Sequence, residues 1–215
     1  MKSIALASQS PRRHQLLEQL GASMGFEVVV LAPDADEDAE ALEQVLPGER
    51  PQDYVQRVTL LKLEAGITRL RGRYAGNQQA WPILASDTTV ALSDEILGKP
   101  EDAKDARRML KSLSGCSHWV HTAVAVAFGP GEQQVVKALS SSKVEFAELS
   151  EAWINWVIQT GEPMDKAGAY AIQGHAGSMI KRIEGSPTGI MGLPLHETRQ
   201  LLAQVIGEKS GLETR

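Results

Sequence analysis

Hydrophobic and polar residues along this chain follow two periodicities, one typical of strands and one typical of helices. Short apolar runs bounded by turn residues predict strands at 4–7, 26–31, 82–92, 119–128, 135–146 and 178–184. Apolar positions three and four residues apart predict helices at about 11–21, 51–70, 101–113, 150–161 and 195–205. The two long runs around Gly129-Pro130-Gly131 predict an antiparallel hairpin. We therefore expect an α/β fold.

The first strand leads into a helix through the stretch Ala7-Ser8-Gln9-Ser10-Pro11-Arg12-Arg13. Ser10 suits the N-cap and Gly21 the C-terminal end of this helix. Arg12 and Arg13 lie in the first turn, where the helix dipole disfavours each cation by about 0.3–1 kcal/mol. A phosphate-like oxyanion would complement the two guanidinium groups and the free N–H groups. The pattern alone equally allows a capped surface helix with two solvated arginines.

Other charged residues have weaker signals. Asp87 interrupts an apolar strand, where an ionised carboxylate is costly unless it is hydrogen-bonded, bound to a metal or catalytic. Asp36-Glu37 follows the second strand within an acidic segment, so one carboxylate could face a site. Arg57 and Lys62 lie beside the apolar stripe of the second helix, where surface charges are the usual outcome.

Composition narrows the class of protein. The 215 residues carry 42% hydrophobic and 23% charged side chains, as in ordinary globular domains, and a net charge of -5. This balance argues against a broad nucleic-acid-binding face but not against a small anionic substrate. The single cysteine, Cys116, fits a reducing compartment. Without a signal peptide or a membrane-length apolar run, we expect a cytoplasmic protein with no membrane partner.

The metal-ligand chemistry points to a hard cation. None of the five histidines has a zinc-type ligand spacing, and no nucleophile-elbow serine motif is present. A cation held by carboxylates and substrate phosphates fits better, with Glu37 and Asp87 as candidate ligands.

Several motifs together resemble the Maf proteins, over about residues 3–205. They are Ser8-Gln9-Ser10-Pro11-Arg12-Arg13, Asp36-Glu37, Tyr54-Val55-Gln56-Arg57 with Lys62, Ser86-Asp87-Thr88, Gly98-Lys99-Pro100, Asp165-Lys166-Ala167-Gly168 with Gln173-Gly174, and Gly192-Leu193-Pro194. Two features depart from the family pattern. Leu61-Lys62-Leu63 stands where Glu-Lys-Ala is common, and residues 39–49 look like additional loop length.

The resemblance implies an enzyme that cuts a nucleoside triphosphate to the monophosphate and pyrophosphate. It implies an elongated mixed β-sheet flanked by helices in two lobes, similar to the inosine triphosphate pyrophosphatases. We expect one domain at 1–208 with the site between its lobes and a tail at 209–215. The resemblance further implies a divalent cation, Mg²⁺ or Mn²⁺, and a homodimer as a common assembly.

Three positions that differ between branches of the family read Arg12, Thr88 and Gln173 here. This trio resembles the branch that hydrolyses dTTP and UTP in a house-cleaning role. The branch that acts on 7-methyl-GTP tends to carry a bulky aromatic residue, Gln and Glu. Another modified nucleotide remains an alternative substrate, and a septum-formation or cell-division regulator that binds nucleotide without turnover is an alternative function.

We expect a role for each candidate site residue. Arg12, Arg13 and the helix N-terminus would hold the phosphate chain, with hydrogen bonds from Ser8 and Ser10. Lys62 and Lys99 would neutralise the departing pyrophosphate, as phosphoryl transfer requires. Asp87 would activate water or bind the metal, and Gln173 would pair with a pyrimidine. Arg57 and Thr88 complete the expected substrate-binding set.

Overall fold

The fold is built on one long mixed sheet. The computed structural model describes residues 2–34, 37, 41–74, 81–129 and 134–206. Within these ranges the sheet has seven strands, in the order β2-β1-β3-β5-β6-β7 with β4 beside the end of β3. They are β1 (Lys2–Leu6), β2 (Phe26–Val30), β3 (Ile83–Leu92), β4 (Glu95–Leu97), β5 (Ser117–Phe128), β6 (Gln134–Phe146) and β7 (Ile180–Glu184). β1 pairs in parallel with β2 and β3, and the other pairings are antiparallel, so the predicted mixed sheet and hairpin are confirmed.

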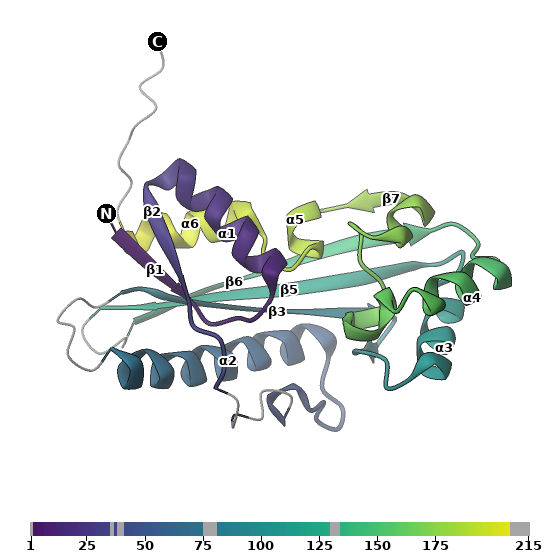
Figure 1. The fold of residues 1–215 in the computed structure, drawn as a ribbon, viewed down its shortest axis with the longest axis horizontal. Helices are drawn as coiled ribbons and strands as arrows, with labels where there is room; N and C mark the ends of the chain where they lie inside the picture. Colours follow the sequence, from purple (N-terminus) through teal and green to yellow (C-terminus); the bar gives the residue numbers. More distant parts are fainter. Residues whose placement is uncertain (1, 35–36, 38–40, 75–80, 130–133, 207–215) are drawn as a thin grey trace, which may run out of the picture.

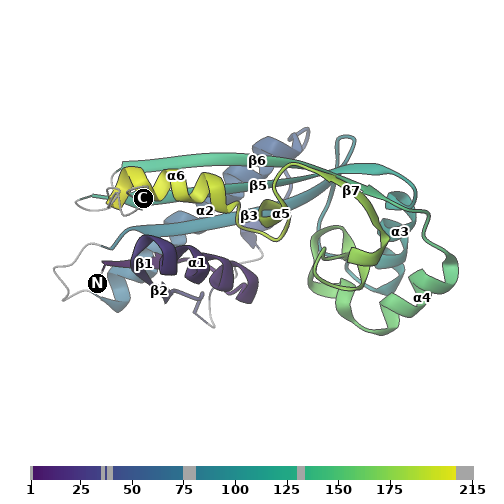
Figure 2. The ribbon, with the colours of Figure 1, turned by 90° about the horizontal axis from the view of Figure 1, so that it is seen from above.

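Helices cover both faces of this sheet. The α-helices are α1 (Pro11–Met24), α2 (Pro51–Arg73), α3 (Ala103–Leu113), α4 (Glu151–Gln159), α5 (Pro187–Ile190) and α6 (Leu195–Ile206). Short 3-10 turns occur at η1 (Ala41–Glu43), η3 (Glu162–Asp165), η4 (Ala167–Ala169) and η5 (His175–Met179). Figure 1 shows α2 along one face of the sheet, α1 and α6 along the other, and α3 with α4 at the far end. The molecule is elongated along β3, β5 and β6, as both views show (Figure 2).

Strand alternation sorts the core into layers. Ile4, Leu6 and Leu84 pack with the apolar faces of α1 and α6, whereas Ala5 and Ile83 pack with α2. This follows from the strand geometry, which sends successive side chains to opposite faces of a sheet. A separate cluster joins the other end of β3 to α3, α4, β6 and η4.

The long strand β3 connects these clusters and becomes polar between them. Ala85 belongs to the α2 layer and Val90 to the α3–α4 cluster. Between them Ser86, Asp87 and Thr89 are buried, although they carry polar side chains. Burial of polar groups requires partners, so this stretch is where functional chemistry is expected.

Two predicted helix ends were wrong. α1 continues past Gly21 and ends at Gly25, which adopts the left-handed conformation at φ 77°. Gly21 serves packing instead, since a Cβ there would lie 2.7 Å from the Phe26 carbonyl oxygen. α2 likewise continues to Arg73, three residues beyond the predicted end.

Two predictions fall partly or wholly outside the described residues. These are the boundary between the domain at 1–208 and the tail at 209–215, and Asp36 with most of the acidic segment around it. Among the helices that the structure describes, none is long and apolar enough to cross a membrane.

Candidate functional site

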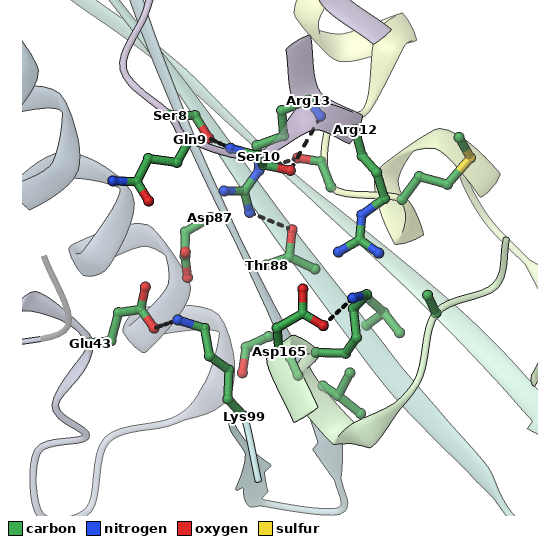
Figure 3. Close-up of a pocket in the computed structure, with 18 of the residues that line it drawn as sticks. Ser8, Gln9, Ser10, Arg12, Arg13, Glu43, Asp87, Thr88, Lys99 and Asp165 are labelled. Atoms are coloured by element: carbon green, nitrogen blue, oxygen red, sulfur yellow. Dashed lines mark hydrogen bonds and ion pairs between the residues drawn. The ribbon is translucent and has the colours of Figure 1, made fainter. Parts of the chain in front are cut away.

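A cavity of about 590 Å³ lies where α1, α2, β3 and the segment around η4 meet. Nine of the predicted site residues line it. They are Ser8, Ser10, Arg12, Arg13, Lys62, Asp87, Thr88, Lys99 and Gln173. In Figure 3, Arg12 and Arg13 approach from one side and Glu43 and Lys99 from the other, with Asp87 and Thr88 between them. The structure therefore brings together residues that are far apart in the sequence.

The N-terminus of α1 forms one wall. Ser10 is the N-cap, and its hydroxyl accepts a hydrogen bond from the Arg13 N–H at 3.4 Å. The Ser8 hydroxyl accepts one from the Ser10 N–H at 3.1 Å. The strand-to-helix turn predicted from the sequence is thus confirmed, and it directs a positive helix end into the cavity.

Arg13 is held in a fixed orientation. Its Nε donates to the Gly192 carbonyl at 2.9 Å and its Nη2 to the Thr88 hydroxyl at 3.2 Å. Thr122 on β5 in turn donates to the Thr88 hydroxyl at 3.0 Å. Burial lowers the pKa of the Arg13 guanidinium, while Asp87 and Glu43 oppose this effect. These hydrogen bonds therefore hold the Arg13 guanidinium in place at the cavity.

Asp87 lies on the face of β3 that is turned toward α2. Its side chain is 8% exposed, and its Oδ1 accepts a hydrogen bond from Lys62 Nζ at 2.5 Å. Lys62 follows Tyr54 and Val58 at four-residue intervals, which places all three on the same side of α2. The buried carboxylate thus has the cationic partner that the sequence required, and Lys62 is not the solvated surface charge that the pattern alone suggested.

Two predicted site residues lie elsewhere. Arg57 is not in the cavity lining, because Glu49 binds its guanidinium at 2.6 and 2.8 Å. Glu37 is also outside the lining, and its carboxylate pairs with Arg69 at 2.8 Å. The structure does not bring Glu37 and Asp87 together as a pair of ligands.

Sequence reasoning missed Glu43, which belongs to the cavity. Its carboxylate lies 2.7 Å from Lys62 Nζ and 3.5 Å from Lys99 Nζ. Burial acts to raise the pKa of Glu43, but the two lysines together lower it below its ordinary value. Nothing in the local pattern singles out Glu43, because it falls in an acidic stretch that reads as a solvated loop.

Asp165 was noted only as part of a motif, yet its carboxylate lines the opposite wall beside Lys166.

Six basic side chains line the cavity: Arg12, Arg13, Lys62, Arg69, Lys99 and Lys166. Three acidic side chains line it: Glu43, Asp87 and Asp165. The lining thus has a net charge of +3, whereas the chain as a whole carries -5. A local positive field of this kind selects small polyanions.

The described residues contain no group of three or more His, Cys, Asp or Glu that could hold a metal ion by themselves. Asp87 could supply one carboxylate ligand to a hard divalent cation, whose other oxygen ligands would come from substrate phosphates and water.

Comparison with known proteins places the chain in a family. The Maf-like protein family matches residues 3–205. A protein of Ralstonia nicotianae named dTTP/UTP pyrophosphatase is 56% identical over 199 residues, covering 93% of this chain and 92% of that protein. A protein of the same name from Albidiferax ferrireducens is 54% identical, with 93% and 94% covered.

A solved HAM1 protein from Coxiella burnetii has the same general fold, with a TM-score of 0.52 at 13% identity, and covers 95% of this chain and all of that one. Because the family match and the close relatives span almost all of the sequence, the chain belongs to the Maf family.

Proposed function

We propose that this protein is a nucleoside triphosphate pyrophosphatase that hydrolyses dTTP and UTP to the monophosphate and pyrophosphate. The observation that carries the proposal is the net positive cavity at the N-terminus of α1, with the buried carboxylate of Asp87 facing it. The names of relatives that are more than half identical over 199 residues support the same substrates.

The cationic groups divide into two sets by their position. Arg12, Arg13 and the N–H groups of α1 lie on one side and would bind the phosphate chain. Lys62 and Lys99, which both contact Glu43, would neutralise the charge that develops on the leaving pyrophosphate. Such a cradle supplies what phosphoryl transfer chiefly needs, which is positioning and charge stabilisation.

Asp87 would orient and deprotonate the attacking water, or hold the divalent cation, at the α-phosphorus. Its hydrogen bond from Lys62 fixes the position of the carboxylate that would take either role. A bound Mg²⁺ or Mn²⁺ would supply further charge neutralisation on the phosphate oxygens.

Gln173 would read the base. It lies in the same cavity as the phosphate-binding residues, on the segment that follows η4. Its amide offers one acceptor and two donor hydrogens to a pyrimidine edge. This role, the cytoplasmic location and the house-cleaning use of the activity all belong to the proposal.

A panel of nucleoside triphosphates with pyrophosphate detection tests the proposal, with and without Mg²⁺ or Mn²⁺. We expect pyrophosphate from dTTP and UTP in the presence of a divalent cation. Preference for 7-methyl-GTP would place the specificity in another branch of the family. Nucleotide binding with no pyrophosphate release would instead favour a regulatory protein.

A further inference from the structure

Glu43, the last residue of the short 3-10 turn η1, reaches into the cavity. Its two carboxylate oxygens face two different lysines, with Oε1 2.7 Å from Lys62 Nζ and Oε2 3.5 Å from Lys99 Nζ. Figure 3 shows Glu43 joined to Lys99 at the edge of the cavity. These are the two cations assigned above to the departing pyrophosphate.

The main chain around Glu43 is tied to α2 by two side chains one turn apart. The Tyr54 hydroxyl donates to the Glu43 carbonyl at 2.9 Å. Arg57 donates to the Gln44 carbonyl at 2.7 Å and also binds the Glu49 carboxylate. Lys62 comes from the same helix, so α2 positions both the carboxylate and the lysine that it contacts. This gives Arg57 a role in anchoring the loop rather than in binding substrate.

The charge at this position resembles that of a bound phosphate. The lysines keep Glu43 ionised by lowering its pKa. A carboxylate between two ammonium groups satisfies the same donors that two phosphate oxygens would use. A triphosphate that reaches both lysines must share their N–H donors with Glu43 or displace it.

We propose that Glu43 competes with the substrate phosphate chain for Lys62 and Lys99, and so sets the affinity for triphosphate and pyrophosphate without taking part in the chemical step. The inference rests on the proposed function, in which these lysines bind phosphate. Glu43 is thus an affinity-determining residue contributed by the additional loop.

The test replaces Glu43 with its uncharged analogue, Glu43→Gln. Pyrophosphate, the reaction product, is used as the ligand, and its binding is measured by calorimetry without divalent cation, so that only contacts with the protein contribute. Since partly exposed ion pairs are individually modest, we expect affinity to rise roughly three- to tenfold. The KM for dTTP should fall by a similar factor, with kcat within about twofold of the parent.

Three further variants make the result specific. Glu64→Gln makes the same charge change on an exposed part of α2 and should leave pyrophosphate affinity unchanged. In a Lys99→Met background, the gain from Glu43→Gln should shrink, because one of the two contested cations is gone. Glu43→Ala provides a second substitution should the amide form a new hydrogen bond.

The outcomes separate the inference from the proposed function. Equal or weaker pyrophosphate binding by Glu43→Gln, or a tenfold loss of kcat, would overturn the competition while leaving the pyrophosphatase intact. Failure of pyrophosphate to bind either the parent or the variant would also overturn the competition, while pyrophosphate release from dTTP in the presence of Mg²⁺ decides the proposed function separately.

Discussion

At the scale of single residues, the site depends on buried charged side chains, whose burial costs free energy unless each has a partner. The Asp87 carboxylate has Lys62 as its partner. The Arg13 guanidinium has Gly192 and Thr88 as its partners. Such arrangements hold charges in place before the substrate arrives, which is what electrostatic catalysis requires.

Replacing Gln173 tests how the base is read. In Gln173→Ala we expect kcat/KM for dTTP and UTP to fall about tenfold, because a base edge loses its hydrogen-bonding partner. Activity on other triphosphates should change less, so selectivity declines. Gln200→Ala, an exposed change on α6, is the matched control. Unchanged selectivity in Gln173→Ala would remove the reading role.

The site residues that could be predicted are those whose neighbours in the sequence form a recognisable pattern. Arg12, Arg13 and Ser10 share one helix start, and Asp87 stands out in an apolar strand. Glu43 and the engagement of Arg57 by Glu49 depend on how a loop folds back on α2, which local patterns do not encode. Glu37 was misplaced for the same reason, since its partner Arg69 lies 32 residues away.

At the scale of elements, periodicity identified the strands and helices well, while helix ends were less secure. A glycine can end a helix or allow close packing, and the sequence does not distinguish these uses. Gly21 packs against Phe26, and Gly25 ends α1 instead. Gly66 in α2 likewise serves packing: a Cβ there would lie 2.5 Å from Ala7 Cβ and 2.9 Å from Ile83 Cδ1.

Two glycines of α2 give a matched pair of stability tests. Gly66→Ala should lower the free energy of unfolding by about 1–3 kcal/mol, since overpacking forces α2 away from the sheet. A Cβ at Gly72 would have no atom within 4 Å, so Gly72→Ala should raise the free energy of unfolding by about 0.5–1 kcal/mol through helix propensity. Urea unfolding at neutral pH measures both. Equal effects of the two substitutions would contradict the close approach of α2 to Ala7 and Ile83.

At the scale of the whole molecule, β3 joins clusters that lie at different ends of the sheet, and the cavity opens beside its polar middle. The family resemblance predicted this elongated mixed sheet, because the matching motifs span residues 3–205. Strand order could not be read from periodicity alone, since β1 pairs with a strand that follows it by more than 70 residues. Long-range pairing of this kind is set by the packing of whole elements.

Buried His118 links the stability of the molecule to pH. It contacts the Tyr170 hydroxyl at 2.7 Å, and burial lowers its pKa to about 4 from 6.5. The unfolded chain therefore binds the extra proton first. The stabilisation that follows from this difference in pKa is complete above pH 6.5. It is lost as the pH falls toward 4, at up to about 1.4 kcal/mol of unfolding free energy per pH unit.

Urea unfolding between pH 7 and 4.5 should show this loss in the parent and a shallower slope in His118→Gln. The comparison is needed because burial also lowers the pKa of His121, which contributes to the slope in both proteins. Parallel slopes would show that His118 titrates alike in the folded and unfolded states.

The most direct test of the account is the turnover of dTTP by Asp87→Asn in the presence of Mg²⁺. Asp94→Asn, the same change at the exposed β3–β4 turn, serves as the control. We expect kcat of Asp87→Asn to fall by at least about a hundredfold, with its circular dichroism unchanged, since general-base catalysis is typically worth that much. Full activity in a folded Asp87→Asn protein would contradict the central claim that this buried carboxylate acts on a triphosphate held at the start of α1.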